Sequence, residues 1–278
     1  SSTPHGMIAV DGRDCLFVAV VLPGEDVKEN VIRDTIVSAH SGNKEYVSSK
    51  FVECTEAENG ALQKIEFKNE DKFNFAFDIV DEIAKKAPEK LAMLHIDKHK
   101  VERRFTFNDM KRASNQCANY FKSLGIKKGD RVMLVLKRHY QFWYAILALH
   151  KLGAVAIPAT NLLQEHDFDY RFNAAEVSAI VCTADGDVAH QVDLAAPASP
   201  TLKTKILVGG EREGWHNFDE EFPLFSAHFY RTEDTACGDD LMLMFFTSGT
   251  TGYPKIAAHN YKYALGHYVT AKYLHGVD

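Results

Sequence analysis

The chain has 278 residues, of which 46% are hydrophobic and 25% charged, a composition typical of a globular protein with a sizeable buried core. Lysine and arginine total 32 against 38 acidic residues, and this net charge of -6 argues against a dedicated nucleic-acid-binding protein. The sequence carries no apolar run long enough to span a bilayer and no secretory signal, so we expect a cytoplasmic protein without a membrane span.

The first region, residues 1–70, reads as a small α+β unit. Apolar residues over 15–22 predict a buried strand, and the stretch 25–40 has helical periodicity. Residues 46–54 and 62–67 predict two further strands. The charged stretch that follows, Lys68 to Lys72, reads as a linker.

The second region alternates helices with apolar strands. A helix over 75–86 and a hairpin over 91–96 and 103–107 come first. Next come the expected helices 108–124, 140–152, 167–174 and 187–195, and the expected strands 131–136, 154–158, 179–183 and 205–208. Because β-α-β crossovers make parallel strands, the pattern predicts an α/β fold with a doubly wound sheet. Residues 209–229 read as irregular.

A loop rich in glycine and hydroxyl groups follows a strand without polar side chains, residues 241–246. Its sequence is Thr247-Ser248-Gly249-Thr250-Thr251-Gly252-Tyr253-Pro254-Lys255, followed by an expected short strand, 256–258, and a helix, 261–274. Glycines let the backbone approach a ligand, and backbone N–H groups together with hydroxyls can surround an anion. A lysine adds charge-assisted hydrogen bonds to phosphate, so the loop predicts a triphosphate site.

Two common nucleotide motifs do not fit this loop. Gly252 is separated from Lys255 by two residues, whereas a Walker A loop requires the lysine directly after the glycine. The Rossmann G-x-G-x-x-G spacing is also absent. The thirteen histidines lack metal-ligand spacing, so we expect no metal held by protein ligands alone.

The loop resembles the AMP-binding signature of the adenylate-forming superfamily. The likeness continues upstream, through Lys127-Lys128-Gly129-Asp130-Arg131-Val132 and through residues 144–158. Residues 160–173 and 247–259 look closest to acetyl- and medium-chain acyl-CoA synthetases. The resemblance covers residues 71–278 and implies a partial AMP-binding domain with a doubly wound mixed sheet.

The resemblance implies an acid–thiol ligase that activates a short- or medium-chain carboxylate with ATP and passes the acyl group to coenzyme A. It places Thr247, Ser248, Gly249, Thr250, Thr251 and Gly252 against the ATP phosphates. Lys255 would bind there too and stabilise charge on the departing pyrophosphate, and His259 would lie near the acyl pocket. Mg²⁺ would accompany the nucleotide. The partners are small molecules, and a homo-oligomer stays open.

Family members are longer than this chain, and we expect this polypeptide alone to be inactive. Residues 1–70 resemble the family's mobile C-terminal domain, although Ala61 stands where that domain carries its adenylation lysine. A permuted arrangement and an unrelated small domain both stay open. Two functional alternatives also remain: an adenylation domain that loads a carrier protein, and a non-catalytic nucleotide-binding fragment.

Overall fold

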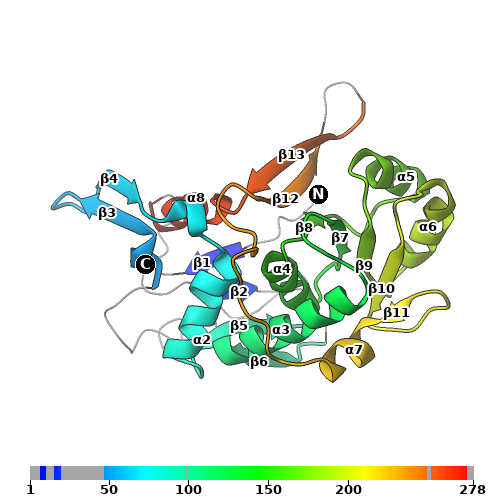
Figure 1. Ribbon diagram of the computed structural model, residues 1–278, viewed down its shortest axis with the longest axis horizontal. Helices are drawn as coiled ribbons and strands as arrows, with labels where there is room; N and C mark the ends of the chain where they lie inside the picture. Colours follow the sequence, from blue (N-terminus) through cyan, green and yellow to red (C-terminus); the bar gives the residue numbers. More distant parts are fainter. Residues whose placement is uncertain (1–6, 11–15, 20–46, 98, 249–251, 274–278) are drawn as a thin grey trace. The chain divides into compact units, whose positions relative to one another are not determined.

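The computed structural model describes residues 7–10, 16–19, 47–97, 99–248 and 252–273 (Figure 1). Contacts within the chain divide it into two units, residues 1–111 with 262–278, and residues 112–261. The helix expected over residues 25–40 lies outside the described residues. The predicted domain boundary at residue 70 was based on the likeness of residues 1–70 to the family's mobile C-terminal domain, and it stays a prediction.

The first unit is built from antiparallel strand pairs and short helical segments. Its described strands are β1 (Met7–Val10) with β2 (Leu16–Ala19), β3 (Val52–Glu56) with β4 (Leu62–Phe67), and β5 (Leu91–Ile96) with β6 (Glu102–Thr106). Its described helical segments are η1 (Val47–Lys50), η2 (Glu70–Lys72), the π-helix η3 (Ala76–Asp81), α2 (Glu82–Lys86) and α8 (Tyr263–Tyr273). The predicted hairpin over 91–107 and the strand 62–67 are confirmed. Helix α3 (Phe107–Ser123) begins in this unit and continues into the second.

The prediction of one strand over residues 46–54 is wrong in its first half. Residues 47–50 form a 3₁₀ turn, closed by a hydrogen bond from Phe51 N–H to Ser48 O (2.9 Å), and strand β3 begins only at Val52. Residues 47–52 run two buried, two exposed, two buried, which is close to a helical repeat and unlike the alternation of a strand. The prediction recognised that this stretch contributes buried residues, but it assigned them the two-residue repeat of a strand.

The second unit contains a seven-stranded mixed sheet in the order β11-β10-β9-β7-β8-β12-β13. Its strands are β7 (Arg131–Val135), β8 (Val155–Pro158), β9 (Ala179–Thr183), β10 (Thr204–Val208), β11 (His216–Asn217), β12 (Leu241–Thr247) and β13 (Lys255–Asn260). Its helices are α4 (Gln141–Leu152), α5 (Glu165–Ala174), α6 (Val188–Ala195) and α7 (Phe218–Glu221), with a 3₁₀ turn η5 (Phe222–Leu224) after α7. Neighbours from β11 to β12 pair in parallel, and β13 pairs antiparallel with β12. The predicted doubly wound mixed sheet is confirmed.

The central strands are buried along their whole length because helices cover the sheet. All five residues of β9 are buried, as are residues 132–135 of β7. Helices α5 and α6 lie side by side (Figure 1), and Phe168 and Phe172 of α5 are fully buried in the core beside β9. Continuous apolar strands of this kind are typical of parallel sheets with both faces covered.

Residues 209–229 are more ordered than the sequence indicated. They contain β11, α7 and η5. We call residues 223–228, which are the end of η5 and the irregular stretch after it, the strap. Three amide side chains of α3 donate to backbone carbonyls of the strap: Asn115 to Ala227 (2.9 Å), Gln116 to Pro223 and Phe225 (3.0 and 3.2 Å), and Asn119 to Ser226 and His228 (2.8 and 2.9 Å). These side-chain donors replace the ladder partners that an irregular backbone lacks.

A buried lysine lies next to this attachment. Lys151, at the end of α4, is 2% exposed, and its Nζ donates to Ser114 Oγ (2.9 Å) and Asn115 Oδ1 (2.7 Å). Asn115 therefore satisfies a buried ammonium with its oxygen and the strap with its nitrogen.

Asn115→Ala should lower the free energy of unfolding by about 2–4 kcal/mol, because it removes an acceptor from a buried charge and a donor from the strap. Urea denaturation measures the change. Asn108→Ala on the same helix is the matched control, since none of the described residues makes a hydrogen bond to the Asn108 side chain in the structure. We expect the control to change stability by less than about 0.5 kcal/mol. Equal effects of the two substitutions would contradict the role given to Asn115.

His150 makes stability depend on pH. Its ring is buried beside Tyr261, with ring centroids 6.0 Å apart, and burial lowers the pKa of His150 to about 4. The unfolded chain binds a proton at His150 near pH 6.5, whereas the native state resists protonation until about pH 4. The contribution to stability is therefore present above pH 6.5 and is lost as the pH falls toward 4.

His150→Phe should remove about 3 kcal/mol of the loss in unfolding free energy between pH 6.5 and pH 4. Denaturant titrations at a series of pH values measure this difference. His190→Phe, at an exposed histidine, is the control and should leave the slope unchanged. Parallel pH profiles for wild type and His150→Phe would show that His150 is protonated in the folded protein.

Candidate functional site

The predicted phosphate loop connects β12 to β13. These strands form an antiparallel hairpin in which Thr247 pairs with Lys255, and Figure 1 shows them running side by side. Strand β13 extends over Lys255–Asn260 and is therefore longer than the predicted strand 256–258. Gly249, Thr250 and Thr251 lie outside the described residues.

Four described residues of the loop are accessible to solvent. Thr247, Ser248, Gly252 and Lys255 are all exposed. The Thr247 hydroxyl donates to the Lys255 carbonyl (3.3 Å), which joins the two ends of the loop. Within the described part of the chain, no carboxylate lies within ion-pair distance of Lys255. An exposed ammonium without a carboxylate partner, next to hydroxyl groups, forms a donor set that fits a phosphate group.

Gly252 has a backbone that a side chain would strain. Its φ is 94°, in the left-handed region, and a Cβ added there would meet nothing within 4 Å. The glycine is therefore required by its backbone conformation and not by crowding in the protein. The open space also leaves room for a ligand to approach the backbone.

His259 is not part of the same cluster as the loop. It lies four residues after Lys255 on β13, which separates their Cα atoms by about 13 Å. Its half-buried ring makes an edge-to-face contact with Phe245 of β12, with centroids 5.8 Å apart. The structure thus places His259 beside an aromatic residue on the hairpin and away from the phosphate loop.

The loop residues fit Mg²⁺ less well than they fit phosphate. The loop contains hydroxyl and backbone oxygens but no carboxylate, the ligand that Mg²⁺ uses most often in proteins. In the part of the chain that the structure describes, no group of three or more His, Cys, Asp or Glu side chains could hold a metal ion.

The described helices include none that is long and apolar enough to cross a membrane.

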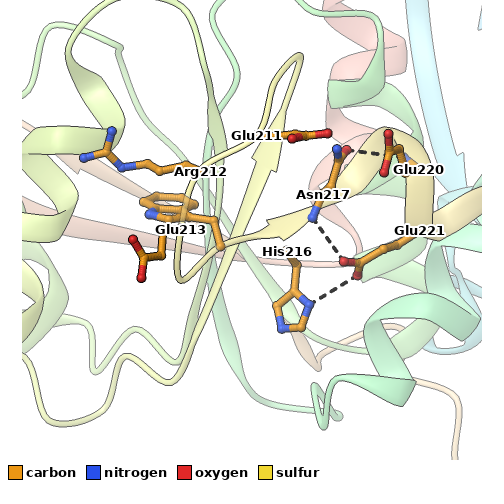
Figure 2. A pocket seen from close by; sticks show the side chains of 8 residues that line it. Glu211, Arg212, Glu213, His216, Asn217, Glu220 and Glu221 are labelled. Carbon is orange, nitrogen blue, oxygen red and sulfur yellow. Dashed lines mark hydrogen bonds and ion pairs between the residues drawn. The ribbon is translucent and has the colours of Figure 1, made fainter.

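A hollow of about 460 Å³ lies at the opposite edge of the sheet, around β11 and α7 (Figure 2). Its lining includes four carboxylates, Glu211, Glu213, Glu220 and Glu221. Figure 2 shows His216 and Asn217 at the Glu221 carboxylate: His216 Nδ1 lies 3.2 Å from it, and the Asn217 N–H donates to it (3.1 Å). The Asn217 side-chain oxygen accepts from the backbone N–H of Glu220 (3.3 Å). This acidic hollow disfavours phosphate and is separate from the loop.

The comparisons with known proteins agree with the sheet and the loop. A family model described as AMP-binding enzyme matches residues 80–277. Acyl-coenzyme A synthetase ACSM5, mitochondrial, of Rattus norvegicus is 36% identical over 202 residues, which are 70% of this chain and 34% of that protein. Acyl-coenzyme A synthetase ACSM1, mitochondrial, of Homo sapiens is 33% identical over 216 residues, 75% of this chain and 37% of that protein. The predicted likeness to acyl-CoA synthetases is confirmed.

Solved structures support the fold. The crystal structure of the anthranilate CoA ligase AuaEII in complex with anthranoyl-AMP matches with a TM-score of 0.64 and 23% identity, covering 73% of this chain and 37% of that one. A fatty acyl CoA synthetase of Mycobacterium tuberculosis matches with a TM-score of 0.57 and 23% identity, covering 68% and 35%. At this level of identity the likeness shows the fold alone.

These relatives bear on two expectations, that family members are longer than this chain and that the protein is cytoplasmic. The chain spans about a third of the length of the curated relatives it matches, 34% for the rat protein. Both relatives are named as mitochondrial, which contradicts the prediction of a cytoplasmic protein. That prediction relied on the absence of a secretory signal, but organelle import uses leaders of a different composition that are separate from the fold.

Gly252→Ala and Gly266→Ala should change stability in opposite directions. Alanine at 252 must adopt a φ near 94°, so we expect a loss of about 1–2 kcal/mol in unfolding free energy. Gly266 lies inside α8 with open space around its Cα, so alanine there should add about 0.5–1 kcal/mol. Urea denaturation of the two variants measures both changes. A neutral effect at 252 would show that the loop adopts a different backbone in solution.

Proposed function

The chain belongs to the AMP-binding enzyme family, and from this we propose that it is part of an ATP-dependent acid–thiol ligase. The proposed enzyme activates a short- or medium-chain carboxylate as an acyl-adenylate, releases pyrophosphate, and transfers the acyl group to coenzyme A. The observation that carries this proposal is the loop between β12 and β13, a hairpin whose first strand is packed in the sheet; its described residues Thr247, Ser248, Gly252 and Lys255 are exposed. The names of the curated relatives support the acyl-CoA product.

The loop residues have distinct proposed roles. Hydroxyls of Thr247, Ser248, Thr250 and Thr251, and backbone N–H groups around Gly249 and Gly252, would bind the ATP phosphates. Lys255 would bind the same phosphates and stabilise the negative charge that develops on pyrophosphate as it leaves. A carboxylate is a poor acyl donor, and adenylation gives it a good leaving group.

The proposal also includes His259 and Mg²⁺. His259, packed against Phe245, would line the space for the carboxylate substrate. Mg²⁺ is proposed only as a companion of the nucleotide phosphates, because the described residues supply no carboxylate cage for it.

The mitochondrial names of the relatives lead us to propose a mitochondrial protein. Small molecules, namely a carboxylate, ATP and coenzyme A, remain the proposed partners. A carrier-protein thiol is the alternative acceptor, because the loop chemistry is the same for both thiols.

Carboxylate-dependent ATP–pyrophosphate exchange on the natural gene product tests the proposed function. Its intact mass should be measured first, and exchange should then be followed with a series of carboxylates from acetate to medium-chain acids. Exchange followed by thioester formation on free coenzyme A would support the ligase. ATP binding without exchange would instead leave a nucleotide-binding protein, and thioester formation only on a carrier protein would favour the alternative acceptor.

Lys255→Ala should reduce the exchange rate by roughly 10- to 100-fold, because a charge-assisted contact to phosphate is lost. Since the side chain is exposed, we expect the unfolding free energy to change by less than about 0.5 kcal/mol. Lys203→Ala, at another exposed lysine, is the matched control and should leave the exchange rate unchanged. Unchanged exchange in Lys255→Ala would remove this lysine from the site.

A further inference from the structure

Helix α5 contacts the hairpin at both ends of the phosphate loop. Two consecutive residues of the helix make these contacts, Tyr170 and Arg171. Both lie more than 70 positions before the loop in the sequence, so no local pattern connects them to it. All of these residues belong to the second unit.

The exit of the loop is held by Tyr170. Its hydroxyl donates to the carbonyl oxygen of Pro254 at 2.9 Å. Its ring lies 5.0 Å from the ring of Tyr253, at an interplanar angle of 31°, and Tyr253 is otherwise 68% exposed. The tyrosine thus contacts the two residues that come directly before Lys255.

The entrance of the loop is held by the same helix. Phe246 precedes Thr247, and its ring lies 6.3 Å from Tyr170 and 5.2 Å from the guanidinium carbon of Arg171. Arg171 is also paired with Asp167 at 3.3 Å, one turn earlier in α5. The guanidinium is therefore fixed from its own helix while it covers the phenylalanine.

The helix is a rigid support for these contacts. Phe168 and Phe172 of α5 are 0% exposed, and their rings stack with centroids 5.4 Å apart. Asp167 closes a capping box with Gln164 at the start of the helix. Because α5 is anchored at its buried face and at its first turn, the backbone position of Tyr170 is fixed.

We propose that Tyr170 is a positioning residue for the phosphate loop, and this inference rests on the proposed ATP-binding role of Lys255. The carbonyl of Pro254 belongs to the same planar peptide unit as the N–H of Lys255. A hydrogen bond that fixes this oxygen therefore also fixes the orientation of the peptide plane that leads into Lys255. Proline has no N–H, so its carbonyl is the only backbone group of that residue that a side chain can hold.

Tyr170→Phe tests this inference, because it removes the hydroxyl and keeps the ring contacts. In the natural gene product we expect the KM for ATP to rise about fivefold, the effect of losing one hydrogen bond, with the KM for the carboxylate unchanged. Hydrogen–deuterium exchange without ligand should become faster in peptides covering residues 252–260. Tyr230→Phe is the control, since Tyr230 is 75% exposed and lies outside the loop; it should change neither measurement.

The outcomes separate this inference from the proposed function. An unchanged KM for ATP, or unchanged hydrogen exchange over 252–260, would overturn the positioning role even if the protein is a ligase. A lower melting temperature with both readouts unchanged would show a structural role only. If the wild-type protein binds ATP but does not catalyse exchange, the proposed function fails, and the Kd for ATP replaces KM with the same fivefold expectation. Wild-type protein that does not bind ATP would overturn both.

Discussion

The second unit depends on burying strands that are apolar on both faces. Strands β7 and β9 expose almost nothing along their length, and this is possible only where helices cover both sides of the sheet. Each crossover helix therefore has to return the chain to the end of the sheet where the previous strand began. This makes the neighbouring strands from β11 to β12 parallel. Strand β12 enters this sheet beside β8 and carries the phosphate loop at its end. Burial thus places β12 and the start of the loop, whereas the contacts of Tyr253 and Pro254 with Tyr170 hold the end of the loop.

The parts of the fold that follow from burial were readable in the sequence. The prediction for β9, residues 179–183, agrees with the structure at both ends, because a strand buried on both faces is a continuous apolar run bounded by polar residues. Strand β13 was predicted too short, since Lys255, His259 and Asn260 are polar and their pairing comes from the backbone of β12. The strap was read as irregular for a related reason. Its order comes from amides of α3 that lie more than 100 positions away.

In the candidate site, too, some features could be predicted from the local sequence and others depend on distant contacts. The loop sequence predicts the phosphate donors, Thr247 to Lys255, because backbone N–H groups at glycines, hydroxyls and a lysine ammonium can all donate to phosphate. Nothing in that stretch indicated what holds it. Tyr170 reads in the sequence as one aromatic residue of an amphipathic helix, and only the fold brings its hydroxyl to Pro254. His259 was predicted by family likeness alone, and the fold brings its ring against Phe245 of β12.

A loop that binds phosphate has two conflicting needs. Its donors must face outward with few partners in the protein, yet their positions must vary little, since ordering them on binding would cost affinity. Under the proposed function, different residues of this protein meet the two needs. Thr247, Ser248, Gly252 and Lys255 are exposed, whereas Phe246, Tyr253 and Pro254 at the loop ends rest on α5. Because α5 is itself fixed by Phe168 and Phe172 in the core, folding would provide the order that the proposed binding needs and would leave Ser248 and Lys255 exposed to a ligand.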